Sequence, residues 1–124
     1  MKRPSFQFYP QDWRADPGLR ACSLEERAVW LELLCLMHDS PRRGVLLLPS
    51  GAPMTDEDIA RNLGLSLKTS RPIIAKIELR GVSSREEGSG ALTSRRMLRD
   101  EYLNQIRSAA GTQGGNPVLL KTMR

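Results

Sequence analysis

Histidine, cysteine and long apolar runs are scarce in this chain of 124 residues. Its one histidine is His38, and its two cysteines, Cys22 and Cys35, belong to no CxxC or Cys/His cluster. This pattern argues against a metal centre, and we expect both cysteines to be small hydrophobic residues, buried or half-buried, rather than a disulfide. The sequence also has no Ser-His-Asp arrangement of note and no glycine loop that would hold phosphates. It therefore predicts neither an enzyme nor a cofactor site.

Apolar segments are also short. The run from Leu33 to Met37 is far too short to cross a bilayer, and no apolar stretch of signal-peptide length follows Met1-Lys2-Arg3. We therefore expect a cytoplasmic protein with no membrane partner. A chain of this length has room for one domain with a modest core, plus tails.

Positive charge is in excess and unevenly distributed. Nineteen Lys and Arg stand against fourteen Asp and Glu, a net charge of +5. Residues 1–40 hold five basic and six acidic side chains, whereas residues 41–124 hold fourteen basic and eight acidic ones. The excess in the second part favours contact with nucleic acid or another acidic surface.

The first 22 residues are predicted to form an aromatic N-terminal arm. Four of the six aromatic residues of the chain lie within eight positions: Phe6, Phe8, Tyr9 and Trp13. Pro4, Pro10 and Pro17 argue against a long helix, so we expect an extended arm with a short strand at Ser5 to Tyr9. Aromatic and basic residues together can stack single-stranded bases, but the sequence favours core or interface anchors here.

The longest periodic segment follows the arm. Ser23 and Glu26 form a capping box that predicts a helix start, and Pro41 predicts its end near Asp39 or Ser40. We expect this helix to be a core scaffold. Its predicted apolar face consists of Leu24, Ala28, Leu31, Leu34, Cys35 and His38, with Trp30 and Met37 broadening it.

The stretch from Thr55 to Met97 is the most informative part of the chain. Thr55 caps a predicted helix over Asp56–Leu63, Gly64 supplies a left-handed residue at its end, and Ser66 offers a cap for a second helix. The core-facing positions of such a helix-turn-helix are apolar: Ile59, Leu63, Leu65, Leu67 and Ile73. Two residues depart from the pattern, since Ser70 stands where an apolar residue is usual and Pro72 lies in the second helix. Pro72 is tolerable if that helix begins at Thr69 or Ser70, whereas a start at Ser66 predicts a kink.

A polar hairpin is predicted next. Residues 82–85 and 91–94 read as short strands around the loop at 86–90, and the run Val45 to Leu48 could add a third strand. The order predicts an α+β, mainly α fold, namely a winged helix-turn-helix with a small two- or three-stranded β-sheet. A further helix is expected over Arg95 to Ala110. We thus divide the chain into an arm (1–22), a winged-helix domain (23–110) and a C-terminal linker or tail (111–124).

The second helix and the wing carry the candidate DNA contacts. On the second helix, Leu67, Ser70, Ile73, Ile74 and Ile77 share one face, and the opposite face is modestly basic. That face has no Asn or Gln to read adenine, so contact with phosphates is expected rather than sequence-specific readout. Glu86 and Glu87 at the wing tip would repel phosphate, which favours a structural or protein-contacting wing. The candidate DNA-binding residues are Lys68, Thr69, Arg71, Lys76, Arg80, Arg85, Arg95 and Arg96.

Six short stretches are distinctive in combination and in order. They are Phe8-Tyr9-Pro10-x-Asp12-Trp13, Leu34-Cys35-Leu36-Met37-His38, Thr55-Asp56, Ser94-Arg95-Arg96-Met97, Arg99-Asp100-Glu101 and Gly114-Gly115-Asn116-Pro117. Over nearly the whole chain they resemble the N-terminal domain of phage and prophage replication proteins, including the YdaU-like family of unknown function. The resemblance implies a winged-helix domain that precedes a linker and a helicase-recruiting part. It thereby implies an origin-binding or replisome-organising role, and it supplies no catalytic or base-reading residue.

Three functional hypotheses remain open from the sequence. The first is a DNA-binding winged-helix module of a phage-type replication initiator, with double-stranded DNA and a replication helicase or loader as partners. The second is a protein-interaction or dimerisation module that recruits a replication partner. The third is a small winged-helix transcription regulator, which would require a palindromic site.

Overall fold

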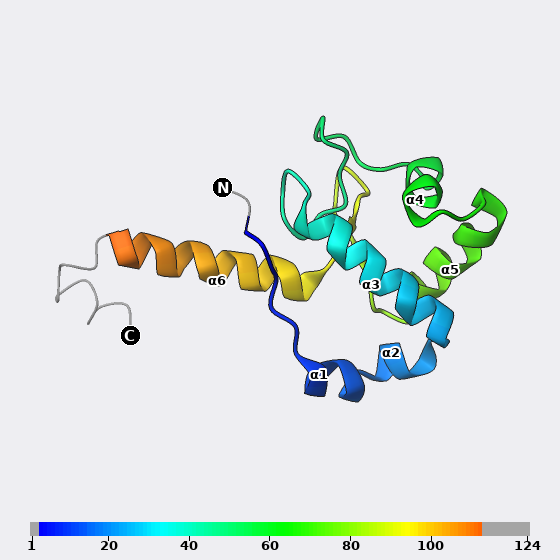
Figure 1. The fold of residues 1–124 in the computed structure, drawn as a ribbon, viewed down its shortest axis with the longest axis horizontal. Coiled ribbons are helices and arrows are strands. Elements are labelled where there is room, and N and C mark those ends of the chain that lie inside the picture. The colour runs from blue at the N-terminus through cyan, green and yellow to red at the C-terminus, as the bar shows by residue number, and fades with distance from the viewer. Residues whose placement is uncertain (1–2, 113–124) are drawn as a thin grey trace.

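The computed structural model describes residues 3–112, which form a mainly helical α+β domain with one two-stranded antiparallel hairpin (Figure 1). The helices are α1 (Pro10–Ala15), α2 (Pro17–Ala21), α3 (Leu24–His38), α4 (Asp56–Leu63), α5 (Leu67–Leu79) and α6 (Arg95–Thr112). The hairpin strands are β1 (Ser84–Arg85) and β2 (Leu92–Thr93). Within the described range, no helix combines the length and the apolar character that spanning a membrane would require.

The core lies between α3 and α5, with α4 packed against α5. Leu33 and Met37 of α3 and Ile77 of α5 are almost fully buried. Leu46, Leu92 and Met97 join the same cluster, so the segment before α4, the hairpin and the start of α6 close around these helices. Burial of each such side chain contributes about 1.5–3 kcal/mol to folding.

The predicted starts of α3 and α4 are confirmed, with their caps. The Ser23 hydroxyl accepts from the Glu26 amide at 3.1 Å while the Glu26 carboxylate accepts from the Ser23 amide at 2.8 Å. Thr55 and Asp58 form the same reciprocal pair at the start of α4. Gly64 ends α4 with a φ of 72°, in the left-handed region that glycine tolerates. The helix-turn-helix connection is therefore built by residues that lie next to one another in the sequence.

The predicted buried face of α3 is right for Leu34, Trp30 and Met37 and wrong for several other residues. Leu24 is 76% exposed, and Leu31 and Cys35 are also exposed. The helix also buries Val29 and Leu33, which the predicted face did not include. Apolar side chains surround most of this helix, so its periodicity fits more than one face and only packing against α5 selects among them.

The second helix begins at the earlier of its two predicted starts. α5 starts at Leu67 with Ser66 as its cap, and Pro72 lies inside it. A proline there cannot donate to the Lys68 carbonyl, so one helical hydrogen bond is missing. Ser70 stands where an apolar residue was expected and is only 2% exposed. Its hydroxyl donates a hydrogen bond to the Leu67 carbonyl oxygen at 3.4 Å. This partner explains how a hydroxyl is tolerated in the core.

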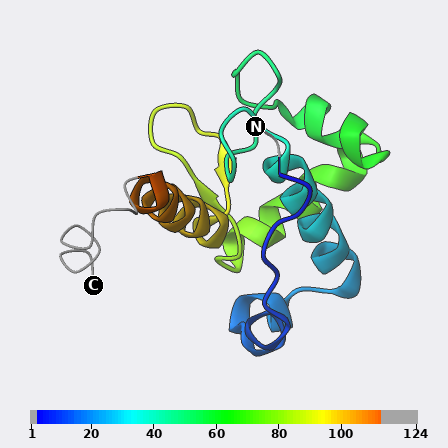
Figure 2. The same cartoon turned by 60° about the vertical axis from the view of Figure 1, so that its left-hand side comes forward.

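The predicted strand at Ser5 to Tyr9 is wrong. Residues 3–9 are extended but pair with no strand, and they lie against the first turns of α6 (Figure 2). Pro10 and Pro17 each occupy the first turn of a short helix, where their fixed φ is favourable and no hydrogen bond is lost. The prolines that exclude a long helix thus begin two short ones.

The hairpin has the predicted position, with Ser84 opposite Thr93 and Arg85 opposite Leu92. The proposed third strand is reduced to a single bridge between Val45 and Thr93, because Leu47 turns to pair with Pro53. The last helix extends two residues beyond its predicted end, to Thr112. The predicted tail from residue 113 onward lies outside the described residues.

Candidate nucleic-acid interface

The outward face of α5 is where the sequence placed it. Ser70, Ile73, Ile74 and Ile77 are buried, whereas Lys68, Thr69 and Pro72 are exposed. Lys68 makes no ion pair among the described residues, and the Thr69 hydroxyl oxygen accepts from the Ser66 hydroxyl at 2.9 Å. The exposed face of α5 can therefore contribute a lysine near its start.

Arg71 is held by the acidic start of α4. Its Nε lies 3.2 Å from Asp56 Oδ2 and its Nη2 lies 3.9 Å from Glu57 Oε1. These carboxylates lie in the first turn of α4, at the positive end of its dipole, and the turn brings them beside α5. Much of the positive charge of Arg71 is thereby balanced within the protein.

Three further candidate arginines also have internal partners. Arg85 pairs with Glu78 at 3.0 Å, and Arg95 donates to the Gly81 carbonyl at 2.7 Å. Arg96 pairs with Asp12 at 2.9 Å and its guanidinium stands 4.6 Å from the centre of the Tyr9 ring. These arginines fasten the hairpin and α6 to the rest of the domain, a structural use that competes with phosphate contact.

The wing tip is less acidic than its sequence indicates. Both Glu86 oxygens accept hydrogen bonds from Arg42 at 2.8 Å. These bonds, together with one from the Ser89 hydroxyl, lower the pKa of Glu86 to about 2. Arg42 thus balances one of the two glutamates that would repel a phosphate.

Lys76 and Arg80 lie in the second half of α5 and at its C-cap, next to α2. Gly18 of α2 approaches so closely that a Cβ there would stand 2.5 Å from the Arg80 carbonyl oxygen. Burial is the main cause that raises the pKa of Cys22. The nearby positive charges of Arg80, Arg27 and Lys76 act in the opposite direction and lower it. The end of α5 and the start of α3 therefore share one region of the molecule.

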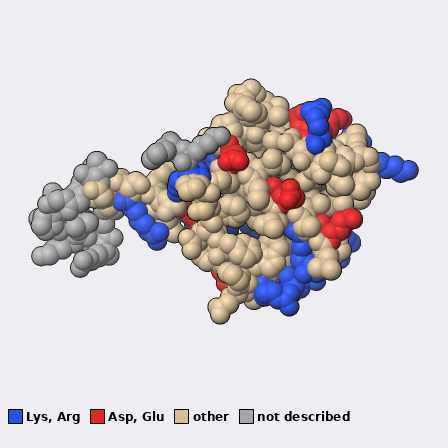
Figure 3. All heavy atoms as spheres, in the orientation of Figure 1, with Lys and Arg blue, Asp and Glu red and all other residues tan. Residues whose placement is uncertain are grey.

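Arg14 and Arg20 extend this region across α1 and α2. Burial lowers the pKa of Arg20, and the positive charges of Arg14 and Arg27 lower it further. We call the group of Arg14, Arg20, Arg27, Lys76 and Arg80 the basic surface. Figure 3 shows Lys and Arg gathered at the lower right of the molecule, where Figure 1 places α2.

No carboxylate within residues 3–112 forms an ion pair with any member of the basic surface. Asp16 and Glu26 lie nearby and accept hydrogen bonds from backbone amides at the starts of α2 and α3. The negative charge of Asp16 acts on Arg20 and partly offsets the lowering of its pKa. Arg20 donates to the Trp13 carbonyl at 3.4 Å, and the Nε atoms of Arg20 and Arg27 are buried without a partner. The cations of this region outnumber the two carboxylates beside them, and a surface with excess positive charge attracts a polyanion.

Three members of the basic surface were not among the predicted contacts. Arg14, Arg20 and Arg27 lie in the part of the chain with a slightly negative net charge, so the charge distribution pointed elsewhere. Their approach to Lys76 and Arg80 depends on α2 packing against the end of α5. No local pattern encodes that long-range contact.

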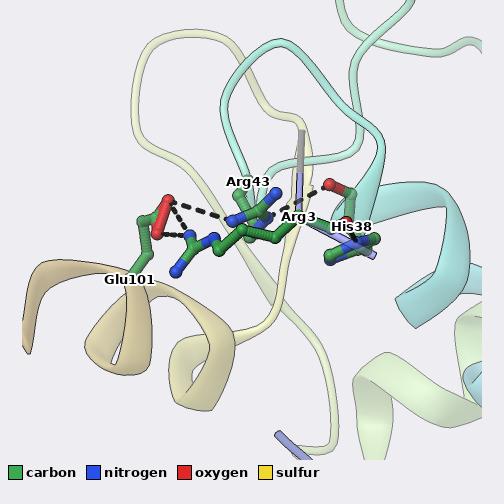
Figure 4. Close-up of polar contacts among 4 residues, drawn as sticks. All are labelled: Arg3, His38, Arg43 and Glu101. Carbon is green, nitrogen blue, oxygen red and sulfur yellow. Dashed lines mark hydrogen bonds and ion pairs between the residues drawn. The ribbon is translucent and has the colours of Figure 1, made fainter. Parts of the chain in front are cut away.

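A cluster of polar side chains holds the N-terminal segment against the rest of the domain (Figure 4). Glu101 of α6 accepts from Arg3 and pairs with Arg43 at 3.5 Å. His38 Nε2 lies 2.7 Å from the Arg3 carbonyl oxygen, and Arg43 Nε donates to the His38 carbonyl at 3.2 Å. The cluster ties the N-terminal segment to the end of α3 and to α6. Among the described residues, no group of three or more His, Cys, Asp or Glu side chains is arranged to hold a metal ion.

Comparison of the sequence with protein-family models and with curated proteins, and of the structure with solved structures, gave no match.

Proposed function

We propose that this protein is a DNA-binding module that holds double-stranded DNA mainly through phosphate contacts, as part of a phage-type replication initiator or replisome organiser. The order of α4, the Gly64 turn, α5 and the hairpin supports a winged-helix assignment within the mainly helical fold. The replication role rests on the family resemblance of the sequence.

The observation that carries the proposal is the basic surface. Its cations come from α1, α2, α3 and the end of α5, and none of them forms an ion pair with a carboxylate of the described chain. Displacement of counterions from DNA by such cations gives binding that depends on salt rather than on sequence. No Asn or Gln stands among the five residues, so we assign them to phosphates rather than to base edges.

Fluorescence anisotropy with a labelled duplex tests this assignment. We expect the triple variant Arg20→Gln, Lys76→Gln and Arg80→Gln to weaken binding at low salt by about tenfold or more. The control changes Arg61 and Arg107 to Gln, which removes exposed charge outside the basic surface, and the losses are compared per charge removed. Equal losses of affinity per charge in both variants would show that only the net charge of the protein matters, and would contradict the assignment.

The alternative is a dimerisation module, and the exposed apolar residues of α6 favour it. Leu98, Tyr102 and Leu103 are 37%, 62% and 38% exposed, and they lie away from Met97, the residue that joins α6 to the core. Pairing of α6 with a second copy of the chain would cover them. Sedimentation velocity discriminates the two functions: a stable dimer with no measurable affinity for duplex DNA would support the alternative and contradict the DNA proposal.

A further inference from the structure

A cavity of about 400 Å³ lies between the N-terminal segment, α1 and the start of α6. We call it the arm cavity. Five of the six aromatic side chains of the chain line it: Phe6, Phe8, Tyr9, Trp13 and Trp30. Its volume is at the lower end of the range typical of small-ligand sites, and its aromatic lining suits a flat ring.

One of these rings is open to solvent. Phe8 is 44% exposed, and its ring centre lies 5.4 Å from that of Trp13 with the planes tilted by 49°. A large aromatic ring exposed at a cavity offers a face on which another ring can stack. Gln7 also lines the cavity, and its amide makes no hydrogen bond with residues 3–112, so it can donate to and accept from the edge of such a ring.

The carboxylates that line the arm cavity are already engaged. Asp12 pairs with Arg96, Asp16 accepts from the Gly18 amide, Asp100 accepts from the Tyr9 hydroxyl, and Glu101 is shared by Arg3 and Arg43. Two arginines of the lining have no such partner in the described chain. Arg95 donates only to a backbone carbonyl, and Arg99 makes no ion pair. The lining holds five arginines and four carboxylates, so the site combines aromatic walls with a net charge of +1 and with two arginines that form no ion pair in the described chain.

We propose that the arm cavity binds an unpaired nucleotide of single-stranded nucleic acid, with its base stacked on Phe8 and its phosphate directed to Arg95 and Arg99. Aromatic stacking joined to basic side chains is the chemistry by which proteins hold single strands without strict sequence preference. In a duplex each base is paired and stacked, so the same ring could not enter. The proposal goes beyond duplex binding and uses none of the five residues of the basic surface.

Tryptophan fluorescence gives a direct readout, because both tryptophans of the chain, Trp13 and Trp30, line the arm cavity. We expect an oligothymidylate of about twelve nucleotides to quench the emission saturably. Phe8→Ala should weaken its affinity by about tenfold or more, and Arg99→Gln should also weaken it and make it less sensitive to salt. Both side chains are exposed, so these variants keep the core.

Two variants of α6 serve as matched controls. Tyr102→Ala removes an aromatic ring that is 62% exposed outside the cavity, and Arg107→Gln removes an exposed charge outside it. Neither should change oligothymidylate affinity. Absence of saturable quenching, or equal losses in the cavity and control variants, would overturn the proposal.

Three competing ligands test which kind of molecule the arm cavity prefers. Thymidine monophosphate that binds as tightly as the oligonucleotide would assign the cavity to a free nucleotide, and a phosphotyrosine peptide that binds more tightly would assign it to a protein. Either result overturns the single-strand assignment. A blunt duplex should compete weakly. The variant Arg20→Gln, Lys76→Gln and Arg80→Gln should keep the quenching, so failure of the duplex proposal would leave this one standing.

Discussion

Gly18 determines how closely α2 can approach the end of α5. A Cβ at this position would stand 2.5 Å from the Arg80 carbonyl oxygen and 3.1 Å from Val82 Cγ2. The first of these is a backbone atom that cannot rotate away. One residue without a side chain thus permits the contact that brings Arg20 toward Arg80.

We therefore expect Gly18→Ala to lower the free energy of unfolding by about 1–3 kcal/mol, the range for overpacking at a tight contact. Urea denaturation followed by circular dichroism measures it. The control is Gly111→Ala near the end of α6, where an added Cβ would meet nothing within 4 Å and where alanine is the better helix former. A Gly18→Ala variant as stable as the wild-type protein would contradict the close approach.

The ion pair between Arg42 and Glu86 should make the stability of the protein depend on pH. The pKa of Glu86 falls from 4.5 to about 2 in the folded protein, so the carboxylate stabilises the fold above pH 4.5. That contribution is lost as the pH falls toward 2. We expect the free energy of unfolding to decline over this interval.

Urea titrations at pH 6 and pH 3 compare the wild-type protein with Glu86→Gln. The Gln variant should lose less stability between the two values, because its side chain does not titrate. Glu87→Gln is the neighbouring control, since Glu87 is exposed and makes no ion pair within residues 3–112. An identical pH dependence in Glu86→Gln and wild type would refute the role of the pair.

At the scale of elements, the starts of α3 and α4 and the Gly64 turn follow from the sequence, since each cap joins residues three positions apart. The face that α3 buries does not, because apolar side chains surround the helix and α5 selects among them. The basic surface is likewise predictable from the sequence only in part. Lys76 and Arg80 belong to a readable amphipathic helix, whereas Arg20 joins them only through the packing of α2 on α5.

Pro72 is the residue of α5 that departs most from helix chemistry. It is exposed and lies inside the helix, where it leaves the Lys68 carbonyl without its helical donor. We expect Pro72→Ala to raise the free energy of unfolding by about 1–2 kcal/mol, after allowance for the greater freedom of the unfolded chain. Thermal and urea unfolding measure the change. Ala75→Gly, at an exposed position of the same helix, should have the opposite sign, and a destabilised Pro72→Ala would show that the ring supports α5.

At the scale of the whole molecule, positive charge from the N-terminal part of the sequence meets positive charge from the end of α5 on one side. Arg14, Arg20 and Arg27 come from a segment with slightly more acids than bases, yet they lie beside Lys76 and Arg80. The arm cavity lies on the side of α1 that carries Asp12 and Trp13. The proposed duplex surface and the proposed single-strand site thus share α1, and they can be tested separately.

The most direct test of the central claim is the slope of log K against log salt for duplex binding. We expect a negative slope for the wild-type protein, and a slope shallower by about 2 to 3 when Arg20, Lys76 and Arg80 are changed to Gln, since about 0.9 counterion is released for each phosphate neutralised. The control variant with Arg61 and Arg107 changed to Gln should keep the wild-type slope. A wild-type affinity that does not vary with salt, or a slope unchanged in the Arg20, Lys76 and Arg80 variant, would contradict phosphate binding by the basic surface.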